Sequence, residues 1–113
     1  MSENCLFCKM VAGDIKPDIV FDNDRILAFN DIAPQAPIHI LIIPKKHFST
    51  LNDIDDAALL GELMQTAAQL AKKLGVADTG YRTVINCNEQ GGQAVYHLHI
   101  HLLAGRQMTW PAG

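Results

Sequence analysis

The clearest periodic pattern of hydrophobic positions lies between residues 56 and 74. Leucine, methionine and alanine recur there at intervals of three and four residues, which places them along one face of a helix. Asp55 stands where an N-cap is expected, and Gly75 stands where a helix ends in a left-handed residue. The pattern therefore predicts one long amphipathic helix over residues 56–74.

Five shorter apolar segments have the length and residue types of β-strands. They cover residues 18–22, 25–30, 38–44, 81–86 and 96–104. The third is apolar on both faces, as in a central strand, and a short helix over residues 6–12, ended by Gly13, precedes them all. Because strands and helices do not alternate strictly, the order predicts an α+β fold. We expect an antiparallel sheet of about five strands with one long helix and a short N-terminal helix.

Composition narrows the possible functions. With 113 residues, of which 49% are hydrophobic and 19% charged, the chain is expected to form a single domain over residues 1–113. The net charge is -3 and no basic cluster is longer than two residues, so nucleic acid is not the expected partner. No long apolar run or basic leader occurs, and three cysteines include a Cys-x-x-Cys pair. These features predict a cytoplasmic protein without a membrane span.

The segment VYHLHIHLLAG, residues 95–105, has a histidine at every second position. Side chains of a strand alternate between its two faces, so His97, His99 and His101 share one face and the aliphatic residues between them share the other. Burying three imidazoles is costly unless each finds a hydrogen bond, a metal or a charged ligand. The pattern therefore favours a functional site over simple packing.

Two kinds of site fit such a strand. A His-x-His pair can bind a catalytic zinc ion that keeps an open position for water. Alternatively, the central histidine is a nucleophile and its neighbours handle protons and phosphate charge. Both use neutral imidazole near pH 7, so the strand alone does not separate them.

The cysteines favour the second kind of site. Cys5, Cys8 and His47 offer three nitrogen or sulfur ligands, and a tetrahedral structural zinc needs four. His97 would supply the fourth and leave the other two histidines of the strand free. Unligated thiols remain an alternative for the Cys-x-x-Cys pair, and a redox pair is a weaker one because no βαβ pattern surrounds it.

The sequence HLHIHLL, residues 97–103, matches the His-φ-His-φ-His-φ-φ signature of the histidine triad (HIT) superfamily, in which φ is an apolar residue. Residues 31–47, 80–86 and 91–108 and the Trp-Pro pair near the end resemble its histidine-triad nucleotide-binding branch, in the same order. The resemblance covers nearly the whole chain.

This resemblance implies a HIT-like fold whose sheet continues across a homodimer, and no organic cofactor. It implies hydrolysis of P–N bonds in purine nucleoside phosphoramidates, such as adenosine 5′-monophosphoramidate or conjugates of the aminoacyl-AMP type. His99 would form the nucleotidyl–histidine intermediate, His101 would contact the phosphate oxygens, and His39 would orient the triad. Trp110 falls in the C-terminal segment that approaches the partner subunit's site in this branch.

The resemblance also assigns a set of nucleotide-binding residues. They are Leu6, Phe7, Met10, Phe29, Asp31, Ile32, Asn86, Gly92, Gln93, Ala94, His99 and His101. The apolar members would form a slot for the flat purine ring. The carboxylate of Asp31 would accept hydrogen bonds from the two ribose hydroxyls. Asn86 and the GGQA turn would contact the phosphate.

Two features distinguish this chain within the branch. Ala94 stands where most relatives have a serine that helps to hold the phosphate or the amine, and losing one such hydrogen bond predicts a rate lower by up to roughly tenfold. The four ligand candidates Cys5, Cys8, His47 and His97 match the pattern of zinc-carrying relatives, which implies one structural Zn²⁺ per chain. That ion would fix the N-terminal helix against the base pocket.

Other functions remain open on the sequence alone. A non-catalytic purine nucleotide sensor or scaffold would use the same site, although it has no need of a nucleophile. A dinucleoside polyphosphate hydrolase of a sister branch has the same triad, but the GRQMTWP ending points away from it. A catalytic zinc hydrolase that uses all three histidines is the least favoured alternative.

Overall fold

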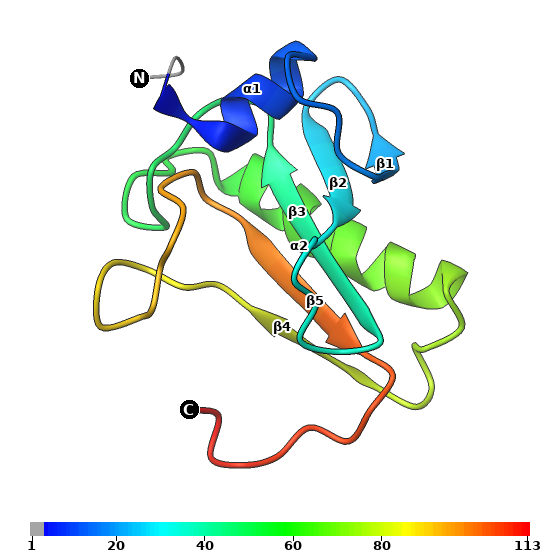
Figure 1. Ribbon diagram of the computed structural model, residues 1–113. Helices are drawn as coiled ribbons and strands as arrows, with labels where there is room; N and C mark the ends of the chain where they lie inside the picture. The colour runs from blue at the N-terminus through cyan, green and yellow to red at the C-terminus, as the bar shows by residue number, and fades with distance from the viewer. Residues whose placement is uncertain (1–3) are drawn as a thin grey trace.

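The chain folds around one antiparallel sheet in the strand order β1-β2-β3-β5-β4. The structure is a computed structural model, and it describes residues 4–113. The strands are β1 (Ile19–Asp22), β2 (Ile26–Asn30), β3 (Ile38–Pro44), β4 (Tyr81–Val84) and β5 (Ile100–Ala104). The apolar strand β3 lies in the middle of the sheet, as predicted, and the α+β architecture is confirmed (Figure 1).

The long helix α2 (Ala57–Lys73) covers one face of the sheet and packs on β3 and β5 (Figure 1). It begins one residue later than predicted, because Asp56 and not Asp55 is the N-cap. The carboxylate of Asp56 accepts a hydrogen bond of 2.9 Å from the backbone N–H of Leu59, three residues further on. Gly75 follows the helix with φ of 78°, as predicted. No helix within residues 4–113 is long and apolar enough to cross a membrane.

The short helix α1 (Leu6–Ala12) covers the opposite face. Neighbouring residues of β2 and β3 alternate between two buried clusters, one under α2 and one under α1. The cluster under α1 consists of Cys5, Phe7, Leu27, Phe29, Leu41 and Ile43. Gly13 ends α1 with φ of 88°, so this helix and its stop signal also agree with the sequence.

Two predicted strands are shorter by two or more residues in the structure, and the strands predicted over residues 18–22 and 25–30 each begin one residue later. The segment predicted as residues 96–104 is regular strand only from Ile100, and the segment 81–86 ends at Val84. The backbone N–H of Leu98 donates to the carbonyl of Phe48 at 2.7 Å, so the chain before β5 pairs with a loop and not with β4. Leu98 and Ile100 are still buried under α2, which leaves the intervening His99 on the side of α1.

Candidate functional site

A pair of histidines connects the two central strands on the face that carries α1. The register pairs His39 of β3 with Leu103 of β5, and Leu41 with His101. His39 and His101 are therefore diagonal neighbours on one face of the sheet. Nε2 of His39 lies 2.9 Å from Nδ1 of His101, and the ring centroids are 5.2 Å apart.

The hydrogen bonds around this pair fix its tautomers. The backbone N–H of Gln35 donates to Nδ1 of His39 at 2.9 Å, so the proton of neutral His39 is on Nε2. That proton is donated to Nδ1 of His101, which leaves the N–H of neutral His101 on Nε2, the nitrogen turned away from the pair. A carboxylate oxygen of Asp31 lies 3.4 Å from Nε2 of His39. Sequence reasoning had no means of finding Gln35, because a backbone N–H acts here and every residue but proline has one.

His99 is held with its other nitrogen free. Its Nδ1–H donates to the carbonyl oxygen of His97 at 2.7 Å, so the lone pair is on Nε2. The ring of Phe7 meets the ring of His99 edge-on, with centroids 5.2 Å apart and planes at 90°. The centroid of the His101 ring is 5.0 Å from that of His99. His99 is 7% exposed, so few other orientations are open to it.

The same environment keeps these imidazoles neutral. Burial lowers the pKa of His99 and of His39 below the usual range for histidine, although the carboxylate of Asp31 acts in the opposite direction. Burial, together with the nearby His99 and His39, lowers the pKa of His101 to about 4. At neutral pH the ligand-free site therefore presents one free lone pair, on His99, beside an N–H donor on His101.

A second group of side chains, which we name the Cys–His cluster, lies at the N-terminal end of α1, beside Phe7. It consists of Cys5, Cys8, His47 and His97, whose four ligand atoms all lie within 4.8 Å of one another. Sγ of Cys5 is 3.3 Å and Sγ of Cys8 is 3.5 Å from Nδ1 of His97. Nδ1 of His47 is 3.2 Å from Sγ of Cys8 and 3.2 Å from Nδ1 of His97. These four residues could hold a metal ion.

The donor set of this cluster fits a tetrahedral metal ion. Bonds of about 2.0–2.3 Å place tetrahedral ligand atoms roughly 3.3–3.8 Å apart, close to the separations observed. Nε2–H of His97 donates to the carbonyl of Pro44 at 2.8 Å, so its Nδ1 lone pair faces the sulfurs. Burial and the adjacent Cys5 raise the pKa of Cys8 to about 11. A cation is what would stabilise a thiolate there. Cys87, the third cysteine, lies outside the cluster.

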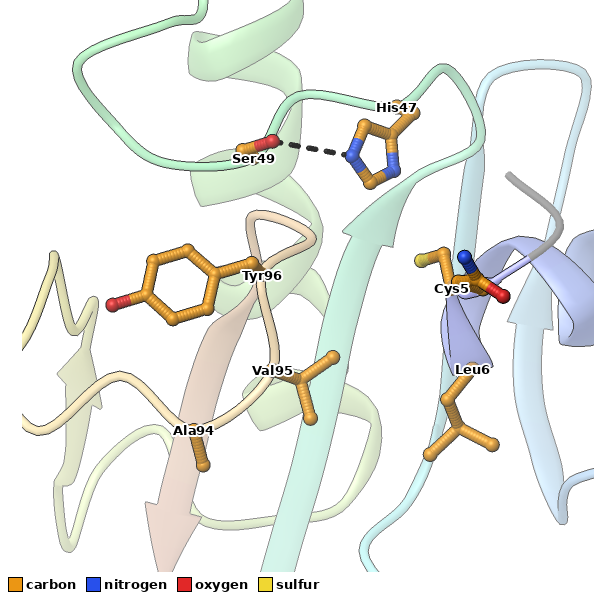
Figure 2. Close-up of a pocket in the computed structure, with 8 residues that line it drawn as sticks. Cys5, Leu6, His47, Ser49, Ala94, Val95 and Tyr96 are labelled. Atoms are coloured by element: carbon orange, nitrogen blue, oxygen red, sulfur yellow. Dashed lines mark hydrogen bonds between the residues drawn. The ribbon is translucent and has the colours of Figure 1, made fainter. Parts of the chain in front are cut away.

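A cavity of about 420 Å³ borders the Cys–His cluster. Its lining comprises Asn4, Cys5, Leu6, His47, Ser49, Ala94, Val95 and Tyr96. Figure 2 shows Val95 turned toward Leu6 across the opening, with His47 and Ser49 above them and a 3.3 Å hydrogen bond between His47 Nε2 and Ser49 Oγ. Two ligands of the cluster, Cys5 and His47, can thus be reached from this cavity. No histidine of residues 97–101 is part of its lining.

The residues assigned to the nucleoside do not form one surface here. Phe7 and Phe29 are buried with their rings 5.4 Å apart, and Met10 packs on the same apolar cluster. Leu6 is exposed, and Ile32, in the loop after β2, is 98% exposed. Asp31 is half-buried and, as described above, lies against His39.

The turn between β4 and β5 is held together from within. Nδ2 of Asn86 donates to the carbonyl of Gly91 at 2.7 Å. A side chain on Gly91 would place its Cβ 2.4 Å from the carbonyl oxygen of Cys87, and Gly92 has φ of 77°, so both positions require glycine. Ala94 follows with an exposed side chain.

Gln93 has a role that the sequence did not reveal. Its side chain is buried, accepts a hydrogen bond from the N–H of Asn88 and donates to the carbonyls of Ser49 and Val95. The bond to Ser49 ties the turn to the loop after β3, and the other two lie within the turn. The side chain of Gln93 therefore braces the turn, and its backbone remains the part that a ligand can approach.

Known proteins resemble this chain over nearly its whole length. Residues 12–108 match the model of the HIT domain family. The chain is 50% identical to an uncharacterised HIT-like protein of Synechococcus elongatus over 100% of both chains. It is 46% identical to a purine nucleoside phosphoramidase of Escherichia coli over 96% of this chain and 92% of that protein. The crystal structure of a HIT family hydrolase from Legionella pneumophila has a TM-score of 0.95, with 55% identity over 97% of this chain and 100% of that one. The chain therefore belongs to the HIT domain family.

Proposed function

We propose that this protein is a purine nucleoside phosphoramidase, which hydrolyses the P–N bond of AMP–amine conjugates through a nucleotidyl–histidine intermediate. The observation that carries the proposal is the free Nε2 lone pair of His99, fixed by the 2.7 Å bond from Nδ1 to the carbonyl of His97. A nucleophile has to be neutral and oriented, and His99 is both. The relationship to the E. coli phosphoramidase supports the choice of bond.

In the first step, Nε2 of His99 forms a bond to phosphorus as the P–N bond of the substrate breaks. The departing nitrogen needs a proton, and His101 is the donor that we assign. The negative charge of a bound phosphoramidate raises the pKa of an adjacent imidazole, so His101 enters this step as an imidazolium. It gives its Nε2 proton to the amine and becomes neutral.

In the second step, water attacks the phosphorus of nucleotidyl-His99. Neutral His101 accepts a proton from this water, the bond from phosphorus to Nε2 breaks, and AMP and free His99 are restored. His39 supports the reaction by orienting the ring of neutral His101 before the substrate binds. When His101 is an imidazolium its Nδ1 also carries a proton, so the Nε2–H of His39 would then turn to the carboxylate of Asp31, 3.4 Å away. The atoms and charges balance as phosphoramidate plus water giving AMP plus amine.

For the nucleotide we propose the contacts that the family resemblance assigned. The carboxylate of Asp31 lies 3.4 Å from the His39 ring, so a ribose bound to Asp31 would have its phosphate near the triad. In the turn, Gly92 and Ala94 would offer backbone N–H groups to the phosphate oxygens, and Asn86 would lie beside them. The exposed Ile32 and Leu6 would close on the purine when it binds.

The test is the release of ammonia from adenosine 5′-monophosphoramidate by the native protein and by His99→Ala. We expect turnover by the native protein and a rate lower by at least about a thousandfold in the variant. Turnover retained by His99→Ala would contradict the mechanism. No turnover by either protein, with AMP still bound, would favour the nucleotide sensor.

We assign the Cys–His cluster to one structural zinc ion. The support is its two sulfurs and two imidazole nitrogens at separations suited to tetrahedral coordination. Zinc with four protein ligands has no open position for water, so it would contribute stability and not an attacking hydroxide. Metal analysis of folded protein purified without chelator should give about one zinc per chain. A content below about half would contradict this assignment.

A homodimer is also part of the proposal. In the described part of the chain β4 is an edge strand with one neighbour, so another strand could add there. Trp110 is 82% exposed, and its segment is held nearby because Arg82 donates to the carbonyl of Thr109 and Arg106 to that of Gln35. Such an aromatic residue suits a partner surface. Sedimentation that gives a stable monomer of 12.4 kDa would contradict the dimer.

A further inference from the structure

The ring of His99 is held at two points. Its Nδ1–H donates to the carbonyl of His97 at 2.7 Å, and the ring of Phe7 packs edge-on against it with centroids 5.2 Å apart. These two contacts are made by different segments of the chain, and little of the ring is open to solvent. The direction in which Nε2 points therefore depends on where His97 and Phe7 are.

The two residues that contact the ring of His99 are both tied to the Cys–His cluster. His97 is a member of the cluster, and its fully buried ring lies 5.8 Å from that of Phe7. Phe7 stands between Cys5 and Cys8 at the start of α1, where Sγ of Cys5 accepts a hydrogen bond from the N–H of Cys8. Any shift of this turn relative to His97 moves the two contacts of His99 apart.

The cluster is also open to exchange with solution. The cavity of about 420 Å³ reaches Cys5 and His47, and Cys8 is only partly buried. His97, in contrast, is fully buried and anchored to the carbonyl of Pro44. An ion can thus reach three of the ligands from outside while the buried fourth ligand stays in the sheet.

We propose that the metal occupancy of the Cys–His cluster sets the position of the nucleophile, with Phe7 and His97 as positioning residues that act through His99. When a metal joins the Cys5–Cys8 turn to His97, the Phe7 ring and the His97 carbonyl clamp the imidazole between them. Without it, only hydrogen bonds of 3.2–3.5 Å between the sulfurs and the imidazole nitrogens join the turn to His47 and His97, and the ligands separate. The clamp then loosens.

Loss of the metal should affect the chemical step more than it affects nucleotide binding. Asp31 and the turn that carries Ala94 contain no member of the cluster, so the proposed ribose and phosphate contacts depend little on the metal, whereas the proposed base contacts of α1 depend on it in part. The chemical step depends on it strongly, because a nucleophile displaced by about 1 Å loses on the order of a hundredfold in rate. Metal removal should therefore lower kcat by a larger factor than it raises KM. A purely structural zinc would instead change only the stability of the protein.

The first test needs no substrate. NMR spectroscopy measures solvent exchange of the His99 Nδ1–H, assigned by its absence in His99→Gln, in zinc-loaded and chelator-treated protein. We expect exchange at least about fivefold faster after chelation, and recovery when zinc is added back. Cys8→Ser should resemble the chelated protein, and Cys87→Ser is the matched control that should resemble the loaded one. Unchanged exchange in metal-free protein that retains its far-UV circular dichroism would overturn the proposal.

A second variant separates the clamp from the metal. Phe7→Leu leaves all four ligands in place, so it should keep its zinc while the exchange of the His99 Nδ1–H becomes faster. If Cys8→Ser fails to fold, this variant and the chelated native protein still decide the question. A Phe7→Leu protein with native exchange would remove Phe7 from the clamp and contradict the proposal.

The kinetic part rests on the proposed function. With adenosine 5′-monophosphoramidate, chelation should lower kcat by about tenfold or more and change KM by less than about threefold. Equal kcat with and without metal would overturn the inference. If no phosphoramidate is a substrate, the proposed function fails, while the exchange measurement still tests whether the metal holds His99.

Discussion

His39 and His101 share a hydrogen bond of 2.9 Å between Nε2 and Nδ1, across the boundary of β3 and β5. His39 is the donor of this bond and His101 is the acceptor, because Nδ1 of His39 already accepts a hydrogen bond from the backbone N–H of Gln35. It determines that the free N–H of neutral His101 is on Nε2. The orientation of the ring that would donate the proton in the proposed reaction is thus set by a residue on the neighbouring strand.

Replacing His39 should therefore reduce the rate through His101. In His39→Leu, which has a similar volume and no N–H, Nδ1 of His101 loses its donor, and we expect kcat/KM to fall by roughly 10- to 100-fold. His39→Gln, whose amide can still donate, should retain more activity than the leucine variant. Steady-state kinetics with adenosine 5′-monophosphoramidate measures both. Equal rates in the two variants would mean that the hydrogen bond is not what matters.

Stability should fall in mild acid because of His101. Its folded pKa is about 4 against an ordinary value of 6.5, owing to burial and to the neighbouring His99 and His39, with Asp31 acting in the opposite direction. The unfolded chain therefore binds a proton that the folded chain does not, between pH 6.5 and about 4. The free energy of unfolding should decrease as the pH is lowered through this window.

Urea denaturation at several pH values measures this dependence, with His101→Gln as the comparison. The variant lacks the titrating ring, so its stability should decline less steeply from pH 6.5 to about pH 4. The other buried histidines are present in both proteins. Parallel curves for the two proteins would contradict the assignment.

Ala94 offers a test of how the turn binds phosphate. Its backbone N–H is unaffected by side-chain identity, whereas Ala94→Ser adds a hydroxyl to an exposed position of the turn. We expect kcat/KM to rise by up to roughly tenfold for at least one phosphoramidate, the value of one hydrogen bond. The measurement compares several amine leaving groups, and no change for any of them would disprove this role.

Replacing glycine by alanine should have opposite effects on the stability of the protein at two positions. Gly61 lies in α2, where an added Cβ would have nothing within 4 Å, so Gly61→Ala should stabilise the helix by about 0.5–1 kcal/mol. At Gly91 the same change places Cβ 2.4 Å from the carbonyl oxygen of Cys87, so the turn has to shift. Thermal and urea denaturation should show a gain for the first variant and a loss for the second. Equal effects would mean that the turn adapts without strain.

The order of residues was sufficient to predict which segments form helices and most of the strands, and which histidines and cysteines come together in the folded chain. Hydrophobic periodicity located α2 and β3, because burial on one face or on two leaves a direct trace in the sequence. The alternation in residues 97–101 placed the histidines on one face even though regular strand begins only at Ile100. The Cys-x-x-Cys pair and two histidines were enough to predict a four-ligand group, which the structure brings together.

The orientation of these side chains became visible only in the folded chain. The tautomers of His39, His97 and His99 depend on backbone groups of Gln35, Pro44 and His97, and a backbone N–H or carbonyl leaves no signature in the sequence. Gln93 was assigned to the nucleotide from its place in the turn, yet its side chain points inward to brace the loop. The position of Phe7 between the Cys–His cluster and His99 likewise follows from packing alone. The sequence thus determined which imidazoles and thiols the chain offers, and the fold determined which ring nitrogen of each imidazole is already hydrogen-bonded to the backbone.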